Sequence, residues 1–319
     1  MTAACRLAPI LAWAVATGFA IWAVVRWLGL EAGYPLVPLL AFTPYVAALA
    51  ALAAVALVAL RRFGPGALTA VAAALLIGLV LPRAVGDGER GEASLRVMTA
   101  NMKLGEGDAQ ALTELVREHD VDVLAVQELT APLAARLERA GLDHELHHSV
   151  LAPTSGSAGG GIWSVRPILE EVSDAPDSIA GSQPAVRVRT PEAHEVIVYS
   201  VHAPAPTGAS PASKWAANLA TIPPASLEGP VRIVAGDFNA TLDHDALRDV
   251  IGRGYRDAAE AAGVGLEPTW PNGRLFPPQV TIDHVLVDER AAVAGADVLE
   301  LPGSDHRAVL AEVLLLPPR

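Results

Sequence analysis

The stretch VRIVAGDFNA, residues 231–240, carries an apolar, β-branched run into Gly236, Asp237, Phe238 and Asn239. The run is typical of a buried strand. A carboxylate and a carboxamide at its end serve either a turn or a reaction. Strand alternation would place positions 237 and 239 on one side and Phe238 on the other, toward the core. Gly236 is expected to let a substrate come close to the backbone, which a Cβ would obstruct.

Other apolar runs in the second part of the chain are also interrupted or ended by polar side chains. These sites are Asn101, Glu128, His202, Asp237 with Asn239, Asp283, and Asp305 with His306. Each one alone is explained by a turn, a cap or a hydrogen bond. Six such sites in one domain instead predict that these residues converge on one edge of a sheet sandwich.

The segments around these sites predict the fold class. Residues 94–102, 108–120 and 121–129 have the pattern of a strand, a helix and a strand, and later strand-like runs follow with helix-like segments at 211–222 and 243–254. Several strands in a row, with helices between only some of them, favour an α+β sandwich of sheets flanked by helices. The roughly 225 residues after position 95 are enough for one sizeable core.

The first 82 residues differ sharply in composition from the rest. They contain few charged residues, namely Arg6, Arg26, Glu31, Arg61 and Arg62. Three uncharged apolar runs, about 7–25, 36–60 and 64–81, are each near the roughly 20 residues that cross a bilayer. The sequence predicts three transmembrane helices in residues 1–82, an exposed linker over 83–94 and a catalytic domain over 95–319. A buried apolar helical bundle is the alternative.

Charge also predicts the orientation of the chain and limits its partners. Arg61 and Arg62 form the only basic doublet between the second and third runs, so the positive-inside rule places them in the cytoplasm and the residues after Arg83 outside the membrane. The part after residue 82 has a net charge of about −15 and only Lys103 and Lys214 as lysines, which disfavours nucleic acid as a partner. A single cysteine, Cys5, excludes an intrachain disulfide.

The short segments TANM, VQE, SVHAP, GDFNA, TIDHVLV and SDHRAV occur in this order after residue 95. In order and approximate spacing they resemble the endonuclease/exonuclease/phosphatase superfamily, which is related to pancreatic DNase. The resemblance covers about residues 95–315 and implies a four-layered α/β/β/α sandwich of two mixed sheets. It also implies a metal-dependent phosphoesterase, because a divalent cation neutralises the charge around a phosphorus under attack.

The resemblance implies a role for each polar strand end. Glu128, with Asn101 and Asp305, is implied as the site of Mg²⁺ or Mn²⁺, since hard cations prefer oxygen ligands. Asp237 is implied to orient or deprotonate the attacking water, Asn239 and His202 to donate to the phosphoryl or leaving group, and His306 to act as base or charged stabiliser, oriented by Asp283. Which residue moves which proton stays open.

Other polar residues have less specific explanations. His284 follows Asp283 in a strand and should face away from it, in packing or at the surface. His144, His147 and His148 are expected in a solvated strand or loop. Trp270 and Arg274, in the Pro-rich segment 267–278, are candidate substrate-binding residues, although plain loop packing explains them equally well.

The combined prediction is a multi-pass, membrane-anchored phosphoesterase that acts outside the membrane on a lipid-linked or small phosphoester. The three spans followed by this domain also resemble VanJ-type actinobacterial membrane proteins, which implies a polyprenyl pyrophosphate as one substrate. An extracytoplasmic nuclease and a catalytically inactive binding module are the alternatives. The sequence gives no indication of oligomeric state.

Overall fold

The computed structural model describes residues 3–89, 91–172, 183–191, 194–207, 212–225, 228–274, 276 and 278–315. The chain divides into two compact units. The N-terminal unit comprises Met1–Pro82 with Leu242–Asp245, and the C-terminal unit comprises Arg83–Thr241 with Ala246–Arg319.

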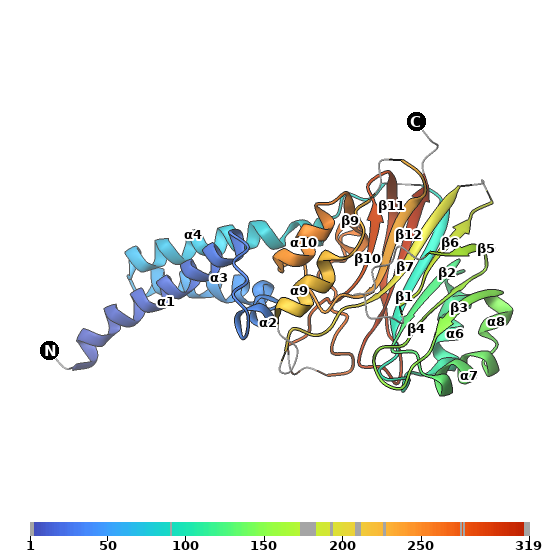
Figure 1. Ribbon diagram of the computed structural model, residues 1–319. Coiled ribbons are helices and arrows are strands. Elements are labelled where there is room, and N and C mark those ends of the chain that lie inside the picture. Colours follow the sequence, from blue (N-terminus) through green and yellow to red (C-terminus); the bar gives the residue numbers. More distant parts are fainter. Residues whose placement is uncertain are drawn as a thin grey trace. The chain divides into compact units, whose positions relative to one another are not determined.

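The C-terminal unit contains two six-stranded mixed sheets (Figure 1). The first sheet has the order β11-β12-β1-β2-β4-β3, and the second has the order β5-β6-β7-β8-β10-β9. Each has one parallel pair near its centre, β1 with β2 and β7 with β8. The strands are β1 (Leu95–Asn101), β2 (Val123–Gln127), β3 (His148–Ala152), β4 (Gly160–Ser164), β5 (Ile168–Glu171), β6 (Ala185–Arg189), β7 (Glu195–His202), β8 (Val231–Asp237), β9 (Tyr255–Asp257), β10 (Asp283–Asp288), β11 (Ala291–Leu299) and β12 (Ala308–Leu315).

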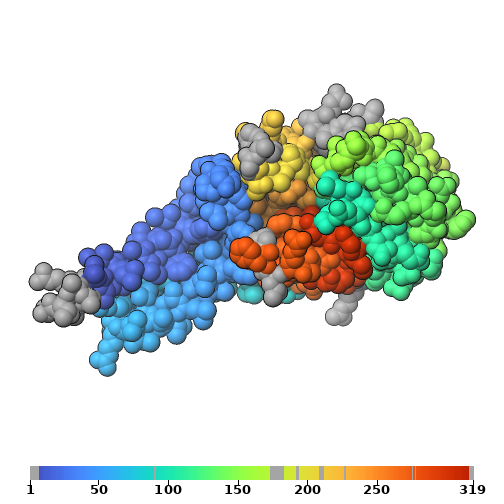
Figure 2. Space-filling view, turned by 90° about the horizontal axis from the view of Figure 1, so that it is seen from below, coloured from blue at the N-terminus to red at the C-terminus, as the bar shows by residue number. Residues whose placement is uncertain are grey.

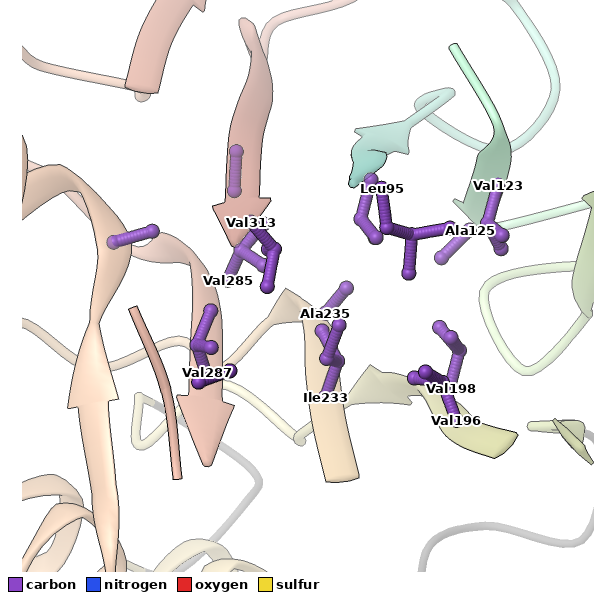
Figure 3. Close-up of a cluster of buried hydrophobic side chains, with 14 of the residues drawn as sticks. Leu95, Val123, Ala125, Val196, Val198, Ile233, Ala235, Val285, Val287 and Val313 are labelled. Carbon is purple, nitrogen blue, oxygen red and sulfur yellow. The ribbon is translucent and has the colours of Figure 1, made fainter. Parts of the chain in front are cut away.

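Strand alternation divides the apolar residues of the C-terminal unit between two cores. Leu95 and Val123 of the first sheet meet Val196 and Ile233 of the second in a buried cluster between the sheets (Figure 3). The neighbours of the inward-facing residues, such as Leu124, point to the opposite face and join a second cluster. Both faces of the central strands are therefore covered, as their almost continuous apolar sequences require.

Helices form the outer layers of the C-terminal unit. Leu112 of α6 and Leu133 of α7 pack on the outer face of the first sheet. Trp215 of α9 is fully buried, and its indole Nε1 donates to the Phe238 carbonyl oxygen at the end of β8 at 3.1 Å. The helices are α6 (Ala109–Glu118), α7 (Ala131–Arg139), α8 (Leu142–Glu145), α9 (Ala212–Ala220), α10 (Asp245–Ile251) and α11 (Ala258–Ala262). The predicted α/β/β/α sandwich is confirmed.

The space-filling view illustrates how distant segments close the C-terminal unit. The teal surface near residue 105 meets the red surface near residue 300 (Figure 2). The Asp108 backbone N–H donates to the Pro302 carbonyl at 2.9 Å, and Asp108 also caps α6 by accepting from the Gln110 and Ala111 N–H groups. The loop before α6 is therefore fixed to the loop before β12.

The N-terminal unit is helical, and one predicted helix is divided. Its helices are α1 (Ala3–Trp27), α2 (Leu36–Leu40), α3 (Thr43–Ala59) and α4 (Phe63–Val80), and a short α5 (Pro82–Val85) follows. The single helix predicted over 36–60 is wrong, because the chain turns at Ala41 and Phe42. Pro44 lies in the first turn of α3, where its missing N–H needs no partner but where its ring prevents a continuous helix from α2.

Two helices of the N-terminal unit, over Leu7–Trp27 and Phe63–Val80, are long and apolar enough to cross a membrane. Between them α3 is apolar but has only 17 residues. Small and apolar residues, including Ala23, Ala47 and Ala72, form the buried contact among these helices. By contrast, Leu52 and Val55 are 68% and 71% exposed. Apolar surface facing outward from helices that pack through small residues is what a lipid environment favours.

A short later segment, Leu242–Asp245, belongs to the N-terminal unit. Within this unit the Arg26 guanidinium forms a buried ion pair with Asp243, with Nε and Oδ1 2.6 Å apart. Arg26 is therefore neutralised, and Arg6 together with Arg61 and Arg62 is left to set the charge bias of the predicted spans.

The predicted linker, residues 83–94, is largely exposed in its described part, as expected, but it is hydrogen-bonded to the C-terminal unit. The Asp87 and Gly88 N–H groups both donate to the Ala261 carbonyl at 2.8 Å, and the Glu89 N–H donates to the Val293 carbonyl. Arg83 is buried. The C-terminal unit therefore begins at Arg83 and not near Leu95, because these backbone groups find partners on α11 and β11 that the sequence does not reveal.

Candidate active site

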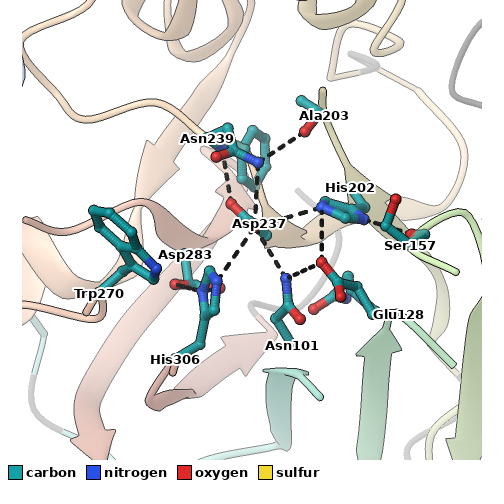
Figure 4. A network of polar contacts seen from close by, with 12 residues as sticks. Asn101, Glu128, Ser157, His202, Ala203, Asp237, Asn239, Trp270, Asp283 and His306 are labelled. Carbon is teal, nitrogen blue, oxygen red and sulfur yellow. Dashed lines mark hydrogen bonds and ion pairs between the residues drawn. The ribbon is translucent and has the colours of Figure 1, made fainter. Parts of the chain in front are cut away.

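The polar strand ends meet at one edge of the two sheets (Figure 4). Asn101 ends β1, Glu128 follows β2, His202 ends β7 and Asp237 ends β8. Asp283 begins β10, which runs antiparallel to β8, so the register pairs Asp283 with Asp237. β12 likewise runs antiparallel to β1, which brings His306, just before β12, to the same edge.

Asp237 lies at the centre of the network, with 1% of its surface exposed. Its Oδ1 accepts from the Asn239 backbone N–H at 2.8 Å, and its Oδ2 accepts from Asn101 Nδ2 at 3.1 Å. Burial raises the pKa of this carboxyl, and the Asp283 charge adds to the effect, against the opposing influence of His306 and His202. Folding therefore makes Asp237 a better proton acceptor than an ordinary aspartate.

Asn239 lies beside Asp237, but not through strand alternation. β8 ends at Asp237, and Asn239 has a left-handed backbone with φ of 47°. Its Nδ2 donates to the Ala203 carbonyl at 2.9 Å and lies 3.3 Å from Asp237 Oδ2. The two side chains are held together by a turn, and Phe238 is fully buried as predicted.

Gly236 is needed for a different reason from the one the sequence suggested. A Cβ at this position would lie 1.9 Å from the carbonyl oxygen of Val201 on the adjacent strand β7. The glycine therefore allows β7 and β8 to approach each other, and substrate access does not explain it.

His306 and Asp283 form a buried pair. The imidazole Nδ1 donates to Asp283 Oδ2 at 2.9 Å, and Nε2 lies 3.9 Å from Asp237 Oδ2. Burial lowers the pKa of His306, but the nearby carboxylates, Asp283 foremost, outweigh it and raise the pKa to about 10. At neutral pH the ring is therefore an imidazolium that faces Asp237.

His202 lies between Glu128, which follows a strand of the first sheet, and Asp237, which ends a strand of the second sheet. Its Nδ1 donates to the Ser157 carbonyl at 2.9 Å, because a carbonyl can only accept. Nε2 then faces Glu128 Oε1 and Asp237 Oδ2, each 3.6 Å away. The Ser157 contact fixes the ring, and nothing in the sequence around Ser157 signals this role.

Glu128 is placed by an unusual backbone conformation. Its φ is 57°, and the nearby Lys103 and Leu104 have φ of 45° and 52°. Non-glycine residues in this region cost roughly 1–3 kcal/mol each and cluster at functional sites. The Glu128 carboxylate accepts from the Leu104 N–H through Oε2 and lies 3.4 Å from Asn101 Nδ2 through Oε1. The strained loops therefore hold this carboxylate in one orientation.

The remaining predicted site residues lie at the rim. Asp305 is partly buried, and its Oδ2 is 3.4 Å from the Trp270 indole Nε1. Arg274 is exposed. Trp270 thus reaches the site through Asp305, whereas Arg274 is not joined to the network by any hydrogen bond between described residues. Residues 275 and 277 of the predicted 267–278 loop lie outside the described part of the chain.

A cavity of about 840 Å³ opens beside this network. Glu128, His202, Asp237, Asn239 and His306 line one end of it. The volume is in the range of small-molecule binding sites. The arrangement can bind a phosphoryl group next to a proton acceptor, a charged imidazolium and oxygen ligands for a cation.

The sequence model of the endonuclease/exonuclease/phosphatase family matches residues 98–306, which span every residue of this network. The chain belongs to the endonuclease/exonuclease/phosphatase family. Members of this family are phosphoesterases and nucleases, so the chain is a hydrolase of phosphoesters. A comparison with curated proteins finds no match.

Solved structures of family members share the fold. A protein of this family from Beutenbergia cavernae has a TM-score of 0.55 at 20% identity, with 70% of this chain and 72% of that one covered. A mannosyl-6-phosphatase from Bacteroides thetaiotaomicron has a TM-score of 0.52 at 17% identity, covering 69% and 100%. D. rerio TDP2, in complex with a single-strand DNA product, has a TM-score of 0.52 at 16% identity, covering 69% and 98%.

The side chains at the site fit the divalent cation on which this family typically depends. Glu128 presents a carboxylate to the cavity, and hard cations take oxygen ligands. Asp237, Asp283 and His306 form a buried group whose potential ligand atoms lie within 4.8 Å of one another. In that group His306 is charged and already bonded to Asp283, and a protonated imidazole cannot be a ligand. The carboxylates thus supply the suitable donors.

His284 faces away from the site, as strand alternation predicts. It is fully buried, with Nδ1 2.8 Å from Asp257 Oδ2 and Nε2 2.8 Å from the Ala240 carbonyl. Both partners only accept, so both ring nitrogens carry protons. His284 therefore stabilises the turn after Asn239 from behind the site. His147 and His148 are exposed, in agreement with their predicted solvated position.

Replacing His284 by Gln is expected to lower the free energy of unfolding by about 3–5 kcal/mol, because Asp257 loses its buried partner. Burial lowers the pKa of His284, but Asp257 outweighs it and the pKa is raised. This stabilisation is complete below the unfolded pKa near 6.5 and disappears as pH rises through the higher folded pKa. In urea unfolding, the difference in the free energy of unfolding between the variant and wild type should become smaller at alkaline pH. His147→Gln is the control. A difference in the free energy of unfolding that increases with pH would contradict the charged pair of His284 and Asp257.

Proposed function

We propose that the chain is a membrane-anchored, divalent-metal-dependent phosphoesterase that hydrolyses a lipid-linked or small phosphoester on the outer face of the membrane. The observation that carries the catalytic part is the convergence of Asp237, Glu128, His202 and His306 on one cavity. A polyprenyl pyrophosphate is one substrate of this class. The architectural resemblance to VanJ-type proteins stays a prediction.

Glu128 would hold Mg²⁺ or Mn²⁺, with Asn101 and Asp305 completing its surroundings. Such a cation, when bound, neutralises charge on the phosphoryl oxygens. Asn101 directs its amide nitrogen at Glu128 and Asp237, while its Oδ1 accepts from the Lys103 N–H at 2.9 Å. This geometry supports a role for Asn101 in orienting the two carboxylates.

Asp237 accepts the proton of the attacking water in this proposal. Its raised pKa and its central position among the donors support the assignment. Asn239 and His202 lie beside Asp237. Asn239 Nδ2 can donate to phosphoryl oxygens as negative charge develops, and His202 Nε2 can do so when the ring is doubly protonated, since Nδ1 already donates to Ser157.

His306 acts as a charged stabiliser of the transition state and not as the base. The pKa of about 10 keeps its ring protonated at neutral pH. Asp283 holds the ring by its Nδ1, which leaves the Nε2 N–H directed toward Asp237 and the space beside it.

The net negative charge of the C-terminal unit supports a small or lipid-linked substrate over a long nucleic acid, because its acidic residues outnumber the basic residues that would replace counterions along a phosphate chain. Trp270, next to Asp305, and the exposed Arg274 are proposed to contact the substrate at the rim. A tether to the membrane would raise the effective concentration of lipid head groups at the site.

Membrane anchoring is supported by the exposed apolar helices, and the outer location by the Arg61 and Arg62 doublet. Three spans would place the residues after Arg83 outside the cytoplasm. Alkaline phosphatase fused at residue 90 is expected to be active in intact cells, and a strongly active cytoplasmic reporter at the same place would reverse the orientation.

The test of the proposed function is phosphate release by the full-length protein in detergent. Polyprenyl pyrophosphates, phospholipids, inositol phosphates and DNA are offered with magnesium, and each is repeated in EDTA. We expect hydrolysis of a lipid-linked or small phosphoester that EDTA abolishes and that added magnesium restores, because carboxylates such as Glu128 need a bound cation before a phosphoryl group can lie beside them. Full activity in EDTA would refute the metal role. Plasmid cleavage alone would favour the nuclease, and no hydrolysis at all would favour the inactive binding module.

A further inference from the structure

The active-site cavity extends beyond the catalytic residues to helix α9. Besides the polar network, it is lined by Lys214, Ala217, Asn218 and Thr221. These positions are spaced i, i+3, i+4 and i+7, so they lie on one face of the helix and its following turn. Helix α9 (yellow in Figure 1) therefore forms a second wall of the site. The sequence alone does not distinguish this face of the helix from a solvated one.

Helix α9 is fixed relative to the catalytic residues. Trp215, the neighbour of Lys214, is fully buried and donates from Nε1 to the carbonyl of Phe238, which lies between Asp237 and Asn239. Leu219, one turn later, is also buried. These contacts fix α9 beside the catalytic residues, and the exposed Lys214 lies on its cavity-lining face.

The charges around the cavity are unequally distributed. The network end has the carboxylates of Glu128 and Asp237, whereas Lys214 is the lysine on the α9 wall. In the described part of the chain Lys214 forms no ion pair. The other lysine, Lys103, is paired with Glu106 at 2.6 Å and does not line the cavity. The same cavity is also lined by Ala203, Pro204 and Ala205.

We infer that Lys214 binds a second phosphoryl group of the substrate, so that the site is suited to organic diphosphates. This inference rests on the proposed phosphoesterase function. The cavity is larger than one phosphoryl group requires, and an ammonium group is its natural partner for a second anion. The apolar wall would receive the organic part.

The reaction follows from this placement. A water oxygen forms a bond to the terminal phosphorus, and the bond from that phosphorus to the bridging oxygen breaks. The water proton passes to the Asp237 carboxylate. The products are inorganic phosphate and an organic monophosphate, whose additional negative charge develops on the bridging oxygen and is stabilised by the Lys214 ammonium group.

The inference is tested with farnesyl phosphate and farnesyl diphosphate as matched substrates for the full-length protein in detergent with magnesium. Phosphorus NMR follows the release of inorganic phosphate. Lys214→Gln is expected to lower the ratio of kcat/KM for the diphosphate to that for the monophosphate by about 10-fold to 100-fold, the effect of losing one charged hydrogen bond. Lys214→Arg should retain most of the ratio.

Arg117→Gln is the matched control, because it removes one positive charge from an exposed pair with Glu145 outside the cavity, and it should leave the ratio unchanged. An unchanged ratio in Lys214→Gln would overturn the inference. So would wild-type protein that hydrolyses the monophosphate and not the diphosphate, although the proposed function would stand. Hydrolysis of neither substrate, nor of any phosphoester in the wider screen, would refute both.

Discussion

Asp237→Asn is expected to reduce kcat for phosphate release by about 10²–10⁴-fold, the contribution of a positioned general base. Asn has nearly the shape of Asp and can keep the contact with the Asn239 N–H, but it cannot accept the proton of water. Because Asp237 is 1% exposed and central to the network, no neighbouring carboxylate occupies the same place. The measurement is single-turnover hydrolysis by full-length protein in magnesium.

The same substitution should not destabilise the protein. A carboxyl whose pKa is raised by folding favours the unfolded state at pH values above its unfolded pKa, and the pKa of Asp237 is raised by burial and by Asp283. Neutral Asn removes that cost, but its amide NH2 would replace the oxygen that accepts from Asn101 Nδ2. The two effects oppose each other, so the midpoint of thermal unfolding should change little. A variant that loses activity together with its fold would leave no support for a catalytic role, and activity above a tenth of wild type would contradict it directly.

His306→Gln is the second substitution with a large expected effect, a decrease in kcat of about 10²–10³-fold, as found when a transition-state donor is removed. Asp283→Asn should have a similar effect, because it removes the carboxylate that keeps the ring charged and oriented. The double variant should be little worse than the more impaired single variant, since the two residues act as one pair. His147→Gln, at an exposed histidine, is the control.

The pH profile separates the two roles open for His306. With a pKa of about 10, the ring is protonated through neutral pH. If His306 is a charged stabiliser, activity should stay constant from pH 7 to about 9 and decrease as pH approaches 10. A base would predict activity that rises over the same interval and levels off only near 10, and that result would reverse the assignment.

Much of the sandwich could be predicted from sequence because its central strands are apolar and β-branched. β7 and β8 are examples, and both were expected. β11 was not, because its sequence AAVAGADVL is rich in alanine and glycine, and only its antiparallel pairing with β12 makes it a strand. The interruption before Pro44 was missed because hydropathy measures apolar length and does not register a turn.

The catalytic residues could be proposed from sequence because polar side chains at the ends of buried strands are conspicuous. The hydrogen-bonded partner of each residue could not be predicted from sequence. The partners Asp283 for His306 and Asp257 for His284 are 23 and 27 residues distant in the chain. Adjacent residues 283 and 284 are separated by the sheet itself, and each finds a carboxylate on its own side.

The sequence by itself determined which residue types lie at the strand ends, and with them the family, the reaction class and the apolar character of the first 82 residues. Only the tertiary structure decided what VRIVAGDFNA does. Gly236 admits the backbone of β7, Asn239 joins Asp237 through a turn, and Phe238 connects the site to α9 and so to Lys214. These contacts depend on the packing of strands and helices that are distant in the chain, and residue order alone does not specify which backbone will lie against which side chain.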